Sequence, residues 1–75
     1  MNLPDRENLP MKVEAFMDGA KGMATHRFSN QELGIKLTKH RENRDEEFKE
    51  TWTMKGLEGE FDNYDELREA AKGLK

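Results

Sequence analysis

The stretch from residue 48 to residue 74 constrains the fold most, because its apolar period changes within one run of chain. Apolar or small residues alternate with polar ones up to Phe61, and apolar residues then recur every three or four positions from Tyr64 to Leu74. A period of two is typical of a half-buried strand, and a period near 3.6 is typical of an amphipathic helix. This stretch therefore predicts two strands followed by a helix.

The dipeptide Lys55-Gly56 is short enough to be a two-residue hairpin loop between these strands. That loop places Trp52 opposite Gly59, so the indole fills the space left by the missing side chain. Asp62 then has a residue type that suits the N-cap of the helix. The register puts nearly every apolar side chain of the hairpin on one face.

The N-terminal part of the chain predicts a tail and a short helix. Residues 1–9 show no periodicity and are expected to form a flexible tail. From Pro10 onward, Val13, Phe16, Met17 and Ala20 follow helical spacing, which predicts a helix that ends near residue 20. A strand is the rival interpretation, and we disfavour it because Phe16 and Met17 would then point to opposite faces.

The middle of the chain gives mixed signals. Residues 22–32 leave strand, loop and helix open, since Ser29 and Glu32 have the spacing of a capping box. Apolar residues alternate over 33–38, which favours a strand. Residues 39–47 contain no apolar side chain and predict a solvated hairpin tip.

These segments predict a small α+β fold with one domain over residues 10–75. An N-terminal helix precedes a three-stranded antiparallel meander, and a C-terminal helix covers one face of that sheet. The expected core consists of the following apolar residues: Val13, Phe16, Ile35, Leu37, Phe48, Trp52, Phe61, Tyr64 and Leu67.

Composition narrows the functional classes. The chain has no cysteine, no long apolar run and no signal-peptide pattern, so we expect a cytoplasmic protein without a membrane partner. Ser29, His26 and His40 form no catalytic or metal-binding pattern in the sequence. We therefore expect no enzymatic activity, no metal and no cofactor.

A DNA-binding accessory protein is the alternative function. Gly59–Asp62, followed by a helix through Glu66, Ala70 and Ala71, resembles the last strand and helix of AP2-type and integrase arm-type DNA-binding domains over about residues 48–74. Those families use the outer face of a three-stranded sheet. The expected basic edge consists of Lys36, Lys39, His40, Arg41 and Arg44. Two predicted outer-face carboxylates, Glu58 and Glu60, oppose this function because they would face phosphates.

The preferred function is a small protein-binding module, an adaptor or inhibitor, and its size alone suits a phage or mobile-element regulator. The chain carries 13 basic and 16 acidic residues, for a net charge of −3, and these charges are segregated along the sequence. Such segregation steers docking. The expected docking residues for a basic protein surface are Glu58, Glu60, Asp65, Glu66 and Glu69. An edge strand also offers self-association.

Overall fold

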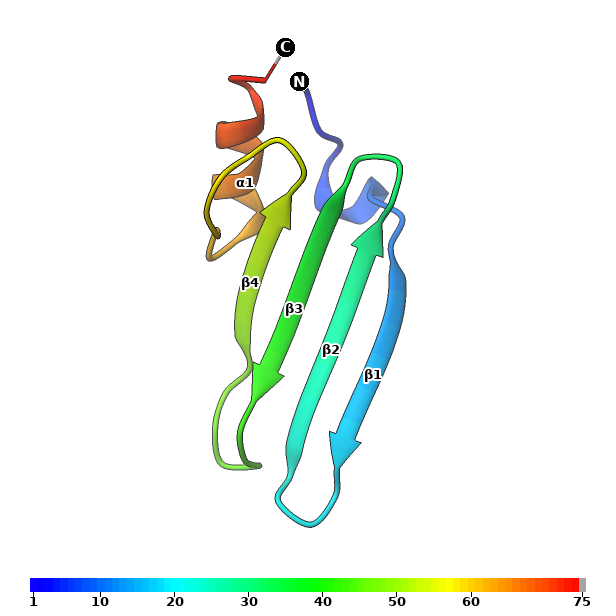
Figure 1. Cartoon of the computed structure of the whole chain (residues 1–75), viewed down its shortest axis with the longest axis vertical. Helices are drawn as coiled ribbons and strands as arrows, with labels where there is room; N and C mark the ends of the chain where they lie inside the picture. Colours follow the sequence, from blue (N-terminus) through cyan, green and yellow to red (C-terminus); the bar gives the residue numbers. More distant parts are fainter. Residues whose placement is uncertain (75) are drawn as a thin grey trace.

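The computed structural model describes residues 1–74 and has a small α+β fold, with a four-stranded antiparallel sheet and one C-terminal helix (Figure 1). A short 3-10 turn, η1, precedes the sheet, and the strands lie in sequence order β1-β2-β3-β4. The elements are η1 (Arg6–Asn8), β1 (Lys12–Asp18), β2 (Met23–Asn30), β3 (Ile35–Arg41), β4 (Lys49–Met54) and α1 (Tyr64–Ala71).

The sheet has two faces that alternate along each strand, since cross-strand partners share a face. The register pairs Phe28 with Leu37 and Leu37 with Trp52, which defines the core face. It pairs Arg27 with Thr38 and Thr38 with Thr51, which defines the opposite, outer face. The outer face also carries Lys36 and His40 of β3 and Lys49 and Thr53 of β4.

The hydrophobic core lies at one end of the core face. Ile35, Leu37, Trp52 and Met54 from the sheet are buried against Tyr64, Leu67 and Ala71 of α1, with Leu3 and Leu9 added by the N-terminal segment. The Trp52 and Tyr64 rings lie 4.9 Å apart between centroids. Packed aromatic and aliphatic side chains thus hold the helix on the sheet.

The helix is too short to cover the sheet. An eight-residue helix spans about 12 Å at 1.5 Å per residue, whereas the eight residues of β2 span about 27 Å in an antiparallel strand. The molecule is accordingly elongated, with principal extents of 46 × 20 × 19 Å. The far end of the core face has no helix over it (Figure 1).

The predicted N-terminal helix is wrong, because residues 12–18 form strand β1. Val13 and Met17 point to the core face while Phe16 points to the outer face, which is the arrangement that the sequence argument set aside. Val13 and Phe16 are 60% and 52% exposed, so neither belongs to the core. Pairing with β2, which occupies much of the undecided 22–32 segment, outweighs the local helical spacing.

The predicted third strand of the meander is also wrong. Within the described part of this predicted strand, Phe61 alone pairs with β4, through two backbone hydrogen bonds with Trp52 of 2.8 and 2.9 Å. Trp52 therefore opposes Phe61 rather than Gly59, a shift of two residues. Glu58 and Glu60 consequently lie in the connection between β4 and α1 and not on the outer face of the sheet.

The ends of the chain meet at the core. The first residues, expected to form a tail, lie against the helix: the Tyr64 hydroxyl donates to the Pro4 carbonyl at 2.7 Å, and Arg68 pairs with Asp5 at 3.3 Å. The helix begins one residue later than predicted, because Asn63 rather than Asp62 is the N-cap and accepts from the Glu66 amide at 2.8 Å.

Candidate functional site

The part of the core face beyond the helix forms the main candidate site, which we call the open half. It consists of Ala24, His26, Lys39, Arg41 and Phe48. The imidazole of His26 stacks on Phe48 with ring centroids 5.3 Å apart, and the Arg41 guanidinium lies 4.8 Å from the Phe48 centroid. The ring of Phe48, 38% exposed, is thus held between two nitrogen-bearing groups while part of it stays open to solvent.

Backbone and side-chain contacts fix this arrangement. Arg41 Nε donates to the Gly22 carbonyl at 3.0 Å, which holds the Arg41 side chain at the start of β2, where Arg41 lies opposite the buried Ala24. Lys39 Nζ lies 5.9 Å from the ring centroid of the half-buried Phe28. Cations over aromatic faces gain electrostatic attraction, and they also stay available to a ligand. The open half therefore combines apolar surface with positive charge.

The carboxylate nearest to these cations in the register is already engaged. Glu50 of β4 lies opposite Lys39 of β3 in the register, but its Oε1 accepts a hydrogen bond from the Trp52 indole at 2.7 Å. Within residues 1–74, neither Lys39 nor Arg41 lies within 4.0 Å of a carboxylate oxygen. A partner with acidic side chains could neutralise both.

The outer face forms a second candidate surface and is basic. Arg27 lies at its centre, between Glu14 and Thr38, and its guanidinium is 5.5 Å from the exposed ring of Phe16. Cations outnumber carboxylates there, with Lys12, Arg27, Lys36 and Lys49 against Glu14 and Asp18. Among the described residues, these four cations have no carboxylate oxygen within 4.0 Å.

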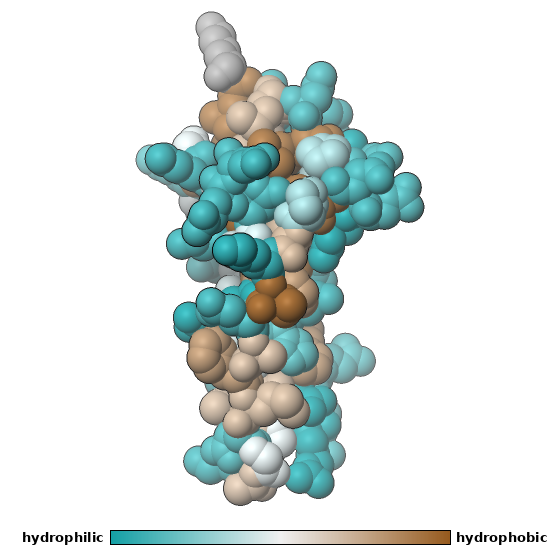
Figure 2. Space-filling view, turned by 90° about the vertical axis from the view of Figure 1, so that its right-hand side faces the viewer, coloured by the Kyte–Doolittle hydropathy of each residue, from teal (hydrophilic) through white to brown (hydrophobic). Residues whose placement is uncertain are grey.

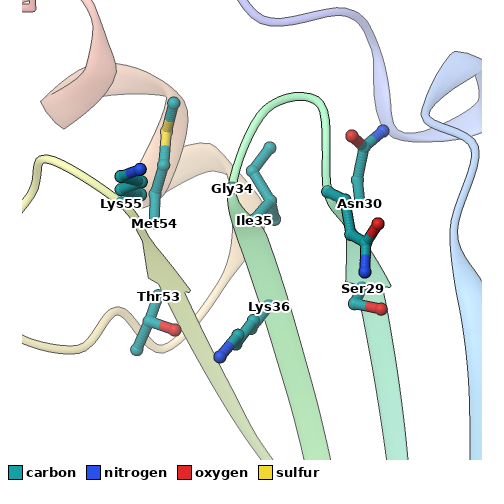
Figure 3. Close-up of a pocket in the computed structure, with 9 residues that line it drawn as sticks. Ser29, Asn30, Gly34, Ile35, Lys36, Thr53, Met54 and Lys55 are labelled. Carbon is teal, nitrogen blue, oxygen red and sulfur yellow. The ribbon is translucent and has the colours of Figure 1, made fainter.

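Two adjoining hollows lie along this surface. One, of about 430 Å³, has Ser29, Lys36 and Thr53 from three neighbouring strands in its lining (Figure 3). The other, of about 500 Å³, shares Ser29 and Lys36 and extends to Arg27. The first hollow has mainly apolar walls that include Ile35 and Met54, whereas the second combines the cations Arg27 and Lys36 with the carboxylate Glu14.

One outer-face cluster has the order of nucleophile, base and carboxylate. The Thr25 hydroxyl lies 2.7 Å from His40 Nδ1, and His40 Nε2 lies 2.9 Å from Glu42 Oε1. His40, which belongs to no catalytic pattern in the sequence, thus has a contact on each ring nitrogen. Both hollows are lined by other residues, so we treat this line of contacts as structural.

The acidic residues expected to dock a partner lie at the helical end of the molecule. Glu58 and Glu60 are exposed in the connection before α1, while Asp65, Glu66 and Glu69 are exposed on the helix itself. Lys72 pairs with Glu69 at 2.8 Å, and this hydrogen bond lowers the Glu69 pKa. The five carboxylates thus gather at one end, although Glu58 and Glu60 do so from a loop.

The residues of the expected basic edge do not share one surface. Lys36 and His40 lie on the outer face, whereas Lys39 and Arg41 lie on the core face, because side chains alternate along β3. Arg44 lies in the β3–β4 turn, where its Nη2 is 3.4 Å from the Gly19 carbonyl. Strand β3 is also an inner strand, with β2 and β4 on either side.

Sequence reasoning missed the contribution of β1 and β2 to both faces. Lys12, Phe16 and Arg27 reach the outer face only because residues 12–18 and 23–30 are strands. The alternation of Thr25, Arg27 and Ser29 with Ala24, His26 and Phe28 could have indicated the second of these strands. It was obscured by the capping-box spacing at Ser29.

The described residues contain no group of three or more side chains arranged to hold a metal ion. No helix of this part of the chain is long and apolar enough to cross a membrane. Comparison with known proteins gives no match to a family model, a curated protein or a solved structure. The two sheet surfaces are therefore the features of this chain that indicate a function.

Proposed function

We propose that this chain is a small protein-binding module that recognises its partner through the open half. The observation that carries this proposal is Phe48, exposed on the core face between His26 and Arg41 instead of being covered by α1. Aromatic residues and arginine are enriched at protein interfaces and dominate their energetics. The partner surface would supply apolar side chains for Phe48 and carboxylates for Lys39 and Arg41.

The acidic helical end then has a complementary part in docking. Its carboxylates lie away from the open half, so the helical end is the more acidic end of the molecule, whereas the charges of the sheet are nearly balanced by Glu42, Asp45, Glu46 and Glu47 in the β3–β4 turn. Such a distribution orients an approaching partner and raises its association rate more than its final affinity. An adaptor or inhibitor that acts by occupying a partner surface needs no further chemistry.

The test is affinity capture from native cells, with nuclease-treated lysate as a control for bridging nucleic acid. The bait is compared with a Phe48→Ala/Arg41→Gln double variant and with a Lys36→Gln variant, whose altered residue lies on the outer face. We expect the same specific protein with wild type and Lys36→Gln, and at least tenfold less with the double variant, since interface anchors typically contribute 2 kcal/mol or more. Undiminished capture by the double variant would exclude the open half.

Nucleic-acid binding by the outer face is a second candidate, because Glu58 and Glu60 are absent from that face while Arg27 lies at its centre. Cations without protein partners are the groups that contact phosphates. If this function holds, duplex binding should weaken with salt, and an Arg27→Gln/Lys36→Gln variant should lower the log-log slope by about two. Equal slopes for wild type and variant would exclude the outer face.

A further inference from the structure

Strand β1 is a free sheet edge with unusual composition. Within residues 1–74 it pairs with β2 alone, whereas the opposite edge strand, β4, is partly closed by its hydrogen bonds with Phe61. Val13, Phe16 and Met17, all on β1, are 60%, 52% and 72% exposed. Figure 2, which faces the β1 side of the molecule, shows brown and tan atoms running down the narrow end between teal margins. Unpaired backbone beside exposed apolar side chains is a template for adding another strand.

The sequence of β1 selects among the ways in which it can pair with itself. In antiparallel pairing about a two-fold axis, opposed residues lie on the same face of the sheet. The axis therefore passes midway between one residue and the same residue of the second copy, and we call that residue the centre of the register. A centre at Glu14 opposes that carboxylate to its own copy. A centre at Phe16 opposes Glu14 to Asp18 of the second copy, twice. Like charges placed directly opposite are destabilising, so both registers are disfavoured.

A centre at Ala15 removes both repulsions. It opposes Lys12 to Asp18 of the second copy and Val13 to Met17 of the second copy, and the two-fold axis repeats each pair. Opposite charges and apolar pairs on facing strands are each stabilising. This register also pairs the full length of the strand, and the two most exposed apolar side chains of β1 then meet each other.

We propose that β1 pairs with β1 of a second copy of this chain, antiparallel and centred on Ala15, to give an eight-stranded sheet. The four Val13 and Met17 side chains form one apolar cluster on the core face, and the two Lys12–Asp18 pairs lie on the outer face. Charged residues usually keep an edge strand from pairing. Here they favour the register centred on Ala15 over the registers centred one residue to either side. The pairing is independent of the open half, which lies on β2, β3 and β4.

Cysteine crosslinking tests this register directly, because the chain contains no cysteine. Directly opposed residues have Cα atoms roughly 4.5–5.5 Å apart, which matches the separation that a disulfide requires. Ala15→Cys, at an exposed position, should therefore form a covalent dimer on oxidation. Val13→Cys is the matched control, since the two Val13 positions would lie four residues out of register, roughly 13 Å apart. Equal crosslinking of both variants, or none of either, would overturn the proposal.

A charge swap provides a second test. Lys12→Glu and Asp18→Lys should each weaken self-association by roughly tenfold or more in sedimentation experiments, since each homodimer gains two like-charge pairs. A mixture of the two variants restores both pairs and should form a heterodimer of near wild-type affinity. Asp18 also accepts from the Ala20 amide at 3.0 Å, so each variant is first checked by its circular dichroism melt. A monomeric wild type, or a mixture no more associated than its components, would refute the pairing.

Discussion

Two aromatic residues on the core face of the sheet, Trp52 and Phe48, allow a direct test of where the core ends. Trp52 is 1% exposed and packs against Tyr64, and its indole donates to Glu50 at 2.7 Å. Phe48, four residues earlier, is 38% exposed and contacts His26 and Arg41 beyond the helix. The sequence places both in the core, whereas the structure places only Trp52 there.

The expected magnitudes differ accordingly. Trp52→Ala should cost about 3–5 kcal/mol, since it removes a fully buried aromatic side chain and leaves a cavity. The whole chain should have a stability of roughly 4–11 kcal/mol, from 0.05–0.15 kcal/mol per residue. Phe48→Ala should cost about 1 kcal/mol, because its ring is only partly buried and the surrounding side chains are free to relax.

Urea unfolding followed by far-ultraviolet circular dichroism measures both changes. Fluorescence is unsuitable, because Trp52 is the only tryptophan. With an m value of about 1 kcal/mol/M, Trp52→Ala should lower the midpoint by about 3 M or more, whereas Phe48→Ala should lower it by about 1 M. Equal shifts for the two variants, or a larger shift for Phe48→Ala, would refute the placement of the core at one end of the sheet.

Three further predictions concern local structure. Burial raises the pKa of Tyr64, so the folded state should lose stability as pH rises from about 10 through this raised value; Tyr64→Phe should abolish that loss in pH-dependent melts, and an unchanged alkaline profile would contradict it. Asn63→Ala should cost about 1 kcal/mol of stability, because it removes the N-cap of the helix. Thermal melts should show a smaller loss for Asp62→Ala, and a larger loss for Asp62→Ala would mean that Asp62 is the N-cap. Gly34 and Gly59 both have positive φ, but a Cβ at Gly34 would lie 2.7 Å from the Lys55 Cβ, whereas a Cβ at Gly59 would meet open space. Gly59→Ala should therefore cost about 1 kcal/mol and Gly34→Ala should cost more. Denaturant midpoints measure both losses, and equal losses would contradict the close approach at Gly34.

The C-terminal helix and the β3–β4 pairing were predictable, because their sequence signals are local. The helix and the strand before it carry clear periods, and the β3–β4 pairing follows from alternating residues on both strands. The predicted third strand is wrong because it rested on a two-residue loop at Lys55-Gly56, which is the shortest connection that the sequence allows. The chain instead uses residues 55–60 as a longer connection that returns to β4 at Phe61, where two backbone hydrogen bonds join Phe61 to Trp52.

The N-terminal half was not predictable from spacing alone. Val13, Phe16, Met17 and Ala20 have helical spacing, and nothing within residues 12–18 reports that β2 will pair beside them. The sequence also could not indicate that α1 would cover only one end of the sheet, because helix length and strand length are compared only after the strands are known. The open half follows from the short helix, and the outer face follows from strands β1 and β2. The sequence therefore predicted neither surface, although it named several of the residues on them.

The proposed dimer and the proposed partner surface are compatible for a geometric reason. A two-fold axis perpendicular to the sheet at Ala15 places both core faces on one side and both outer faces on the other. The two open halves then face the same way, while the two acidic helices lie at opposite ends. A partner with two binding segments would engage the second open half at a high effective concentration, so avidity would exceed the affinity of one site. Self-pairing through β1 would in this way strengthen recognition by the open half without adding a contact to it.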